Sequence, residues 1–100
     1  MKKEDGHKKE NNMPIISSFY GIIVRMYFND NEQQHKPHFH VKYSEYEASF
    51  DFDGNIIVGK FPPKQSKLVV AWAEIHKEEL SALWEVMQGE NQFFKIKGLE

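Results

Sequence analysis

The chain has 100 residues, with 15 acidic and 13 basic side chains and no cysteine. This length allows one small domain, and the missing cysteines exclude disulfides, thiol nucleophiles and cysteine-based metal sites. No apolar run is long enough for a membrane helix, so we expect a soluble, cytoplasmic protein with no membrane partner. The formal net charge of -2 disfavours binding to duplex DNA by this domain alone, because such binding depends on many cationic contacts to phosphates.

The first twelve residues, MKKEDGHKKENN, differ from the rest of the chain. They contain four lysines and three acids, and no apolar residue follows Met1. Such a segment cannot bury enough apolar surface to offset the entropy of ordering it. We therefore predict a disordered tail over residues 1–12 and a single domain over residues 13–100.

Four segments are rich in β-branched and aromatic residues or alternate between apolar and polar residues, as strands do. The dipeptide Asp53-Gly54 between the last two is a strong signal for a tight hairpin, because a type I′ turn needs positive φ at both central positions. Short connections between consecutive strands indicate an antiparallel meander. The predicted strands are Phe19–Phe28, His38–Tyr43, Glu47–Phe52 and Asn55–Phe61.

Residues 63–88 have the spacing of a helix, with apolar side chains every three or four positions from Leu68. Acidic residues directly after His76 resemble the first turn of a new helix, so we predict either one kinked helix or two helices that break near His76. Residues Phe93–Lys97 are a candidate for a short fifth strand at an edge. The expected fold is α+β, a four-stranded antiparallel meander packed on one face by these helices.

Histidine is the main candidate for chemistry. His38 and His40 lie two residues apart on a predicted strand, so their side chains share a face with their Cα atoms about 6 to 7 Å apart. They could hold zinc, nickel or iron if a third ligand came from His35, Asp51 or Glu47. The ordinary alternative is a solvated or stacked pair, and we expect no cofactor at this site.

The same pair could act as general base and general acid in RNA cleavage, with the cation of Arg25 or Lys42 stabilising the developing charge. Pairing the strands in chain order would place five further side chains on the face of the two histidines, namely Arg25, Tyr27, Lys42, Ser49 and Asp51. Alternatively, Arg25 only pairs with Asp51 or Glu47 across the sheet. Because both imidazoles are predicted on the polar face, replacing both with alanine should cost less than about 1 kcal/mol.

Several other side chains are candidates for contact with a partner or RNA, namely Tyr27, Lys42, Tyr43 and Tyr46. Tyr43 and Tyr46 flank a predicted hairpin tip, where they could stack on bases or on partner side chains, and ordinary packing is the alternative. His76 lies on the apolar stripe of the helical region. We predict that it is a helix-boundary histidine packed beside Trp72.

Several phrases resemble a family of small bacterial domains of unknown function, numbered 4160. They are MPIISSFYGI from Met13, PHFH from Pro37, and AWAEIHKEEL from Ala71. The chain departs from the family pattern at Lys36, where a second proline is common, and in the charged extension before Met13. The resemblance implies an arrangement like a toxin–antitoxin pair, in which a second small protein is encoded next to this one.

Two functions are consistent with these observations. The chain is either an interaction module that docks a partner protein through its sheet edge or polar face, or a ribonuclease-like enzyme, with or without a metal ion, that uses His38 and His40. The mild acidity and the absence of a clear third catalytic group favour the interaction module.

Overall fold

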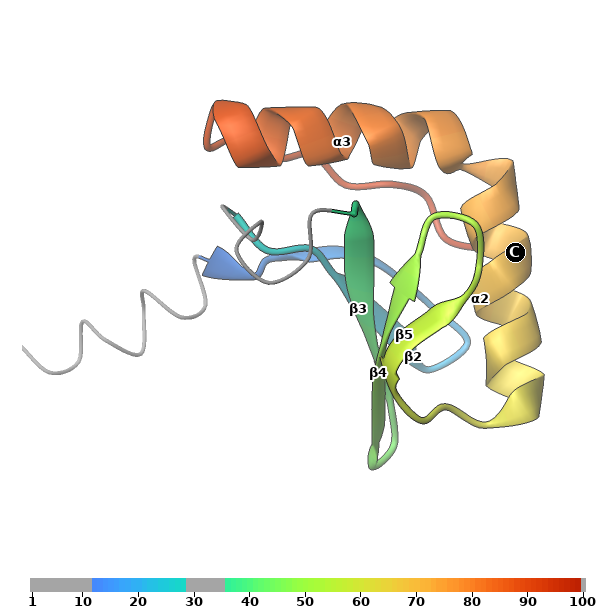
Figure 1. Cartoon of the computed structure of the whole chain (residues 1–100). Coiled ribbons are helices and arrows are strands. Elements are labelled where there is room, and N and C mark those ends of the chain that lie inside the picture. The colour runs from blue at the N-terminus through green and yellow to red at the C-terminus, as the bar shows by residue number, and fades with distance from the viewer. Residues whose placement is uncertain (1–11, 29–35, 100) are drawn as a thin grey trace, which may run out of the picture.

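The fold of the chain is an antiparallel sheet with two helices, seen in a computed structural model that describes residues 12–28 and 36–99 (Figure 1). The strands follow one another across the sheet in the order β1-β2-β3-β4-β5. The predicted α+β meander is therefore confirmed. Its strands are β1 (Ile15–Phe19), β2 (Ile22–Arg25), β3 (His38–Tyr43), β4 (Tyr46–Asp51) and β5 (Ile56–Gly59).

The predicted first strand, Phe19–Phe28, is wrong in its boundaries. Tyr20 and Gly21 have φ angles of 49° and 79°, and they form a turn that separates β1 from β2. Positive φ at both positions is typical of a type I′ turn, which asparagine or aspartate usually begins. Tyr20 continues the alternation of apolar residues in the sequence, so the pattern predicts one continuous strand and gives no sign of a turn.

The fifth strand is consequently β1 rather than the predicted Phe93–Lys97. That C-terminal segment forms no strand, and its Ile96 N–H donates to the Ile16 carbonyl at 2.7 Å. The Trp72 indole N–H donates to the Lys97 carbonyl at 2.9 Å. These two bonds hold the segment along the outer edge of β1.

The helical region breaks at His76, as predicted, into α2 (Pro63–Ile75) and α3 (Lys77–Gly89). The imidazole of His76 lies between the Trp72 ring, 5.8 Å away by centroids, and the Glu79 carboxylate. In Figure 1, α2 lies against one face of the sheet and α3 crosses the end of the sheet at which β3 begins. Within the described ranges, no helix has both the length and the apolar character to cross a bilayer.

The core lies between the sheet and both helices, with Leu80, Leu83 and Met87 of α3 fully buried in it. Trp72 is fully buried, and its ring centroid is 5.4 Å from that of Phe19 and 5.5 Å from that of Phe39. The indole thus joins β1 to β3 from the helix side. At the end of the sheet, Trp84 of α3 packs against Phe52 and His38.

The predicted tail over residues 1–12 lies outside the described residues except for Asn12. The carbonyl of Asn12 accepts a hydrogen bond from the Phe28 N–H at 2.8 Å. The pairing of the N-terminal strand with the chain around β2 therefore begins before Met13.

Candidate functional site

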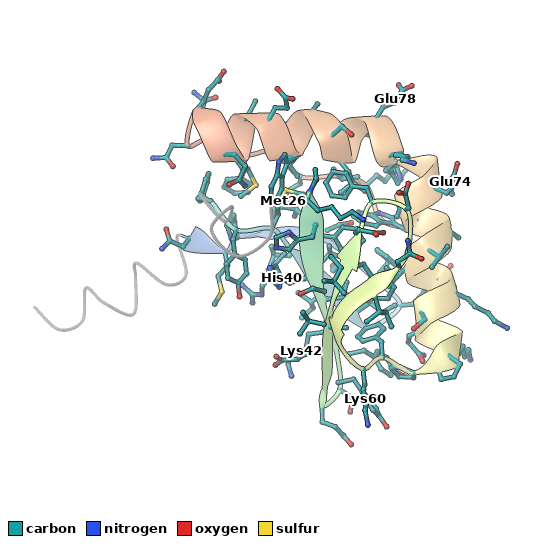
Figure 2. All side chains as sticks on the ribbon, in the orientation of Figure 1. Met26, His40, Lys42, Lys60, Glu74 and Glu78 are labelled. Carbon is teal, nitrogen blue, oxygen red and sulfur yellow. The ribbon has the colours of Figure 1, made fainter. Side chains whose placement is uncertain are left out.

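The face of the sheet opposite α2 carries a groove of about 550 Å³ that extends from β2 to β5. Figure 2 shows His40 and Lys42 projecting from β3 on this side, away from α2. Polar and apolar side chains both line the groove. The main polar ones are Arg25, Tyr27, His40, Lys42, Glu47 and Ser49, and the main apolar ones are Met13, Ile23 and Val58.

Strand register sets the order of these side chains. Arg25 of β2 is directly opposite His40 of β3, His40 is opposite Ser49 of β4, and Ser49 is opposite Val58 of β5. Directly opposed residues of antiparallel strands point to the same face. The four side chains therefore form one row across the sheet.

His40 is held in place within this row. Its Nδ1 is 3.0 Å from the Ser49 hydroxyl, and its ring centroid is 4.1 Å from that of Tyr27. Arg25 is fixed as well, because its guanidinium donates to the Met13 carbonyl at 2.9 Å. The structure thus confirms that Arg25, Tyr27, His40 and Lys42 share one face.

His38 shares the orientation of His40 but not its exposure. The rings of the two histidines are 5.1 Å apart, yet His38 is only 3% exposed, and the Trp84 ring lies 5.4 Å from it. Its Nδ1 is 3.0 Å from the Lys36 carbonyl, and since a carbonyl only accepts, Nδ1 carries the proton. Of the two ordinary alternatives, a solvated pair is wrong for His38, because α3 crosses this end of the sheet, and its ring contacts with His40 and Trp84 agree with a stacked pair.

Asp51, considered above as a metal ligand and as a partner of Arg25, is buried and fully occupied. Its carboxylate accepts the backbone N–H groups of Asp53 and Asn55, each at 2.9 Å, and the side chains of Asn55 and Lys36 at 3.1 and 3.3 Å. Burial alone would raise the pKa of this carboxyl, but the hydrogen bonds, those from Asn55 first, outweigh it and lower the pKa below its ordinary value. Asp51 therefore closes the β4–β5 turn, and within the described ranges its ion pair is with Lys36 and not with Arg25.

The described residues contain no group of three histidine, aspartate or glutamate side chains arranged to hold a metal ion. Of the predicted third ligands, Asp51 is occupied, and Glu47 lies 3.7 Å from the ammonium of Lys42. His35 lies outside the described residues. In this part of the chain, the histidine pair thus gains no third ligand.

Tyr43 and Tyr46 lie on the other face of the sheet from the groove. They are directly opposite each other at the end of the β3–β4 pair. Val41 and Ala48, two residues further along each strand, are both buried, and side chains two residues apart on a strand point to the same face. Tyr43 is partly buried against the core. The structure therefore separates these two tyrosines from the other predicted contact residues.

Ser49 and Val58 are two of the groove residues to which the sequence assigns no catalytic or binding role. Chain order places Ser49 on the polar face, but only the register shows that it lies opposite His40. The position of Val58 depends on a register irregularity between β4 and β5 near Ser49 and Phe50. No sequence pattern marks that irregularity.

The charge on the two sides of the molecule differs. Helix α3 carries three glutamates, Glu78, Glu79 and Glu85, and one lysine. Glu74 and Glu78 lie on the helices, on the opposite side from His40 and Lys42 (Figure 2). The groove, by contrast, is lined by Arg25 and Lys42 with Glu47 as its one acid among the described residues. An anionic group would therefore meet its opposite charge on the sheet face.

Comparison with known proteins supports the sequence resemblance. The model of a family described as "Domain of unknown function (DUF4160)" matches residues 21–85. This range contains the groove strands β2 to β5, both histidines of the pair and helix α2. No curated protein and no solved structure matches the chain significantly.

Proposed function

The chain belongs to the DUF4160 family, and from that premise we propose that it is a protein-binding domain, one component of a two-protein module of the toxin–antitoxin type. The partner is the small protein encoded next to it. The docking site is the groove on the open face of the sheet.

The observation that carries this proposal is the fixed pair of Arg25 and Tyr27 in the groove. Arginine and tyrosine are among the residues that contribute most to binding energy at protein interfaces. The Met13 carbonyl holds the guanidinium, and the His40 ring packs against the phenol ring. Side chains that are already ordered lose less conformational entropy when a partner binds, which favours affinity.

A ribonuclease is the alternative, and it remains a hypothesis. General acid–base cleavage of RNA needs one group to take a proton and another to donate one. His40 lines the groove, whereas His38 lies under Trp84 with its Nδ1 bonded to a backbone carbonyl. With one histidine in the groove, the geometry supports binding better than cleavage.

The proposal is tested by co-expressing the chain with the neighbouring gene product and measuring complex formation by size-exclusion chromatography and calorimetry. Arg25→Glu and Tyr27→Ala should each weaken the complex by at least about tenfold, because each removes an interface anchor. Glu85→Arg on the exposed surface of α3 changes the charge by the same magnitude outside the groove and should leave affinity unchanged.

The proposal fails if no complex forms, or if the groove variants and the α3 variant behave alike. Circular dichroism and thermal melts of each variant separate loss of binding from loss of fold. An RNA cleavage assay on the wild type and His40→Ala tests the alternative. Cleavage that disappears in a folded His40→Ala protein would support the enzyme instead.

A further inference from the structure

The row of side chains across the groove changes in character from one end to the other. It begins with the cation of Arg25, passes the polar pair His40 and Ser49, and ends at Val58. Neighbouring strands lie about 4.8 Å apart, so three strand spacings separate the ends by about 14 Å. A ligand that spans the row meets a charge at one end and an apolar surface at the other.

Both ends are open to a ligand. The guanidinium of Arg25 donates one bond to Met13, and a guanidinium has five N–H groups in a planar fork that fits a carboxylate. Val58 is 56% exposed and lies on an edge strand, Ile56–Gly59, that contains no charged residue. Exposed valine on the sheet offers apolar contact without a competing charge.

We infer, on the basis of the proposed function, that the partner protein contributes an extended segment that crosses the strands. A carboxylate side chain of this segment pairs with Arg25, and an apolar side chain packs on Val58. An extended chain advances about 3.3 to 3.6 Å per residue, so a span of about 14 Å places the two side chains about four residues apart.

Charge complementarity selects this occupant. The acidic surface of α3 repels a carboxylate, while Arg25, which forms no ion pair with a described carboxylate, attracts it to the groove; the charge of Lys42 is paired with Glu47. RNA is the less suitable occupant, because Glu47 lines the same groove and the row ends at Val58 rather than at a second cation. A protein segment with one acidic and one apolar anchor matches both ends of the row.

The test uses three synthetic peptides of eight residues on a serine and threonine background, added to the full chain labelled with ¹⁵N. The first has glutamate at its second position and leucine at its sixth. The second replaces the glutamate with glutamine, and the third moves the leucine to the fourth position.

The first peptide should shift the amide signals of Arg25, His40, Ser49 and Val58. The glutamine peptide should bind at least about fivefold more weakly, because it loses a charge-assisted pair, and the third peptide should also bind more weakly.

Two variants test whether the carboxylate of the peptide binds to Arg25. Arg25→Gln should remove the preference for glutamate over glutamine, whereas Lys67→Gln, which removes one exposed cation on α2, should retain it. The peptide comparison on the wild type decides the question even if Arg25→Gln folds poorly.

Three results would overturn the inference: no signal change with any peptide, equal affinity for the glutamate and glutamine peptides, or an RNA hexamer that displaces the first peptide from the same residues. The proposed function has a separate criterion. A partner complex that depends on the groove, together with equal affinity for both peptides, would leave the proposed function standing and reject the carboxylate.

Discussion

The imidazole of His38 packs against the indole of Trp84, with their ring centroids 5.4 Å apart, although one residue lies on β3 and the other on α3. This contact closes the end of the sheet and removes one histidine of the pair from solvent. It also contradicts the premise behind the expected cost of less than about 1 kcal/mol for replacing both histidines, because His38 is buried.

We predict that His38→Ala destabilises the protein by about 1–3 kcal/mol, because it removes a buried ring and leaves the Lys36 carbonyl without this donor. His40→Ala should cost less than about 1 kcal/mol, since His40 is only half-buried on the open face. Urea denaturation of both variants measures the difference. Equal losses of unfolding free energy would contradict the assignment of separate roles.

Asp51→Asn should lower stability at neutral pH by about 1–3 kcal/mol, because the carboxylate accepts four hydrogen bonds at the β4–β5 turn. The pKa of Asp51 is lower in the folded state than in the unfolded chain, where it is about 3.9. Its contribution is therefore fully present above that unfolded value and is lost as pH falls through the folded pKa.

Unfolding free energies at pH 7, 5 and 3 test this linkage. The difference between wild type and Asp51→Asn should stay constant from pH 7 to 5 and shrink at pH 3. A difference that grows as the pH falls would contradict a lowered pKa of Asp51 in the folded state.

Gly59→Ala should destabilise the protein by about 2 kcal/mol or more. Gly59 has a φ of 87°, and an added Cβ would lie 2.4 Å from the Glu47 backbone oxygen, so the β4–β5 pair would have to shift. Gly89→Ala is the matched control, because a Cβ there meets nothing within 4 Å and the residue is helical. That control should be neutral or stabilising by up to about 1 kcal/mol, and thermal melts that rank the two in the opposite order would refute the prediction.

Tyr20→Asn should stabilise the protein by up to about 1 kcal/mol. Tyr20 has a φ of 49° and is 57% exposed, so asparagine relieves the backbone with little loss of packing. A raised melting temperature is the expected result. A lowered melting temperature would show that the phenol ring of Tyr20 contributes more stability than the positive φ at this residue costs.

Strand alternation and turn residues predicted β3, β4, β5 and the break at His76, because their signals are local. The division between β1 and β2 was missed, since Tyr20 supplies a turn conformation that asparagine usually marks. The cluster of Arg25, Tyr27, His40 and Lys42 followed from alternation and chain order. The burial of His38 could not be predicted, because it depends on α3 turning across the end of the sheet. No local sequence pattern sets the direction of a helix after a break.

The C-terminal segment has one more consequence, for growth of the sheet. Its Ile96 N–H occupies the Ile16 carbonyl, and a Cβ at Gly98 would lie 2.6 Å from the Ser18 oxygen, so this segment fits closely along the β1 edge. A strand from another molecule could pair with the β1 edge only after displacing this segment, so the C-terminal segment closes that edge of the sheet to growth.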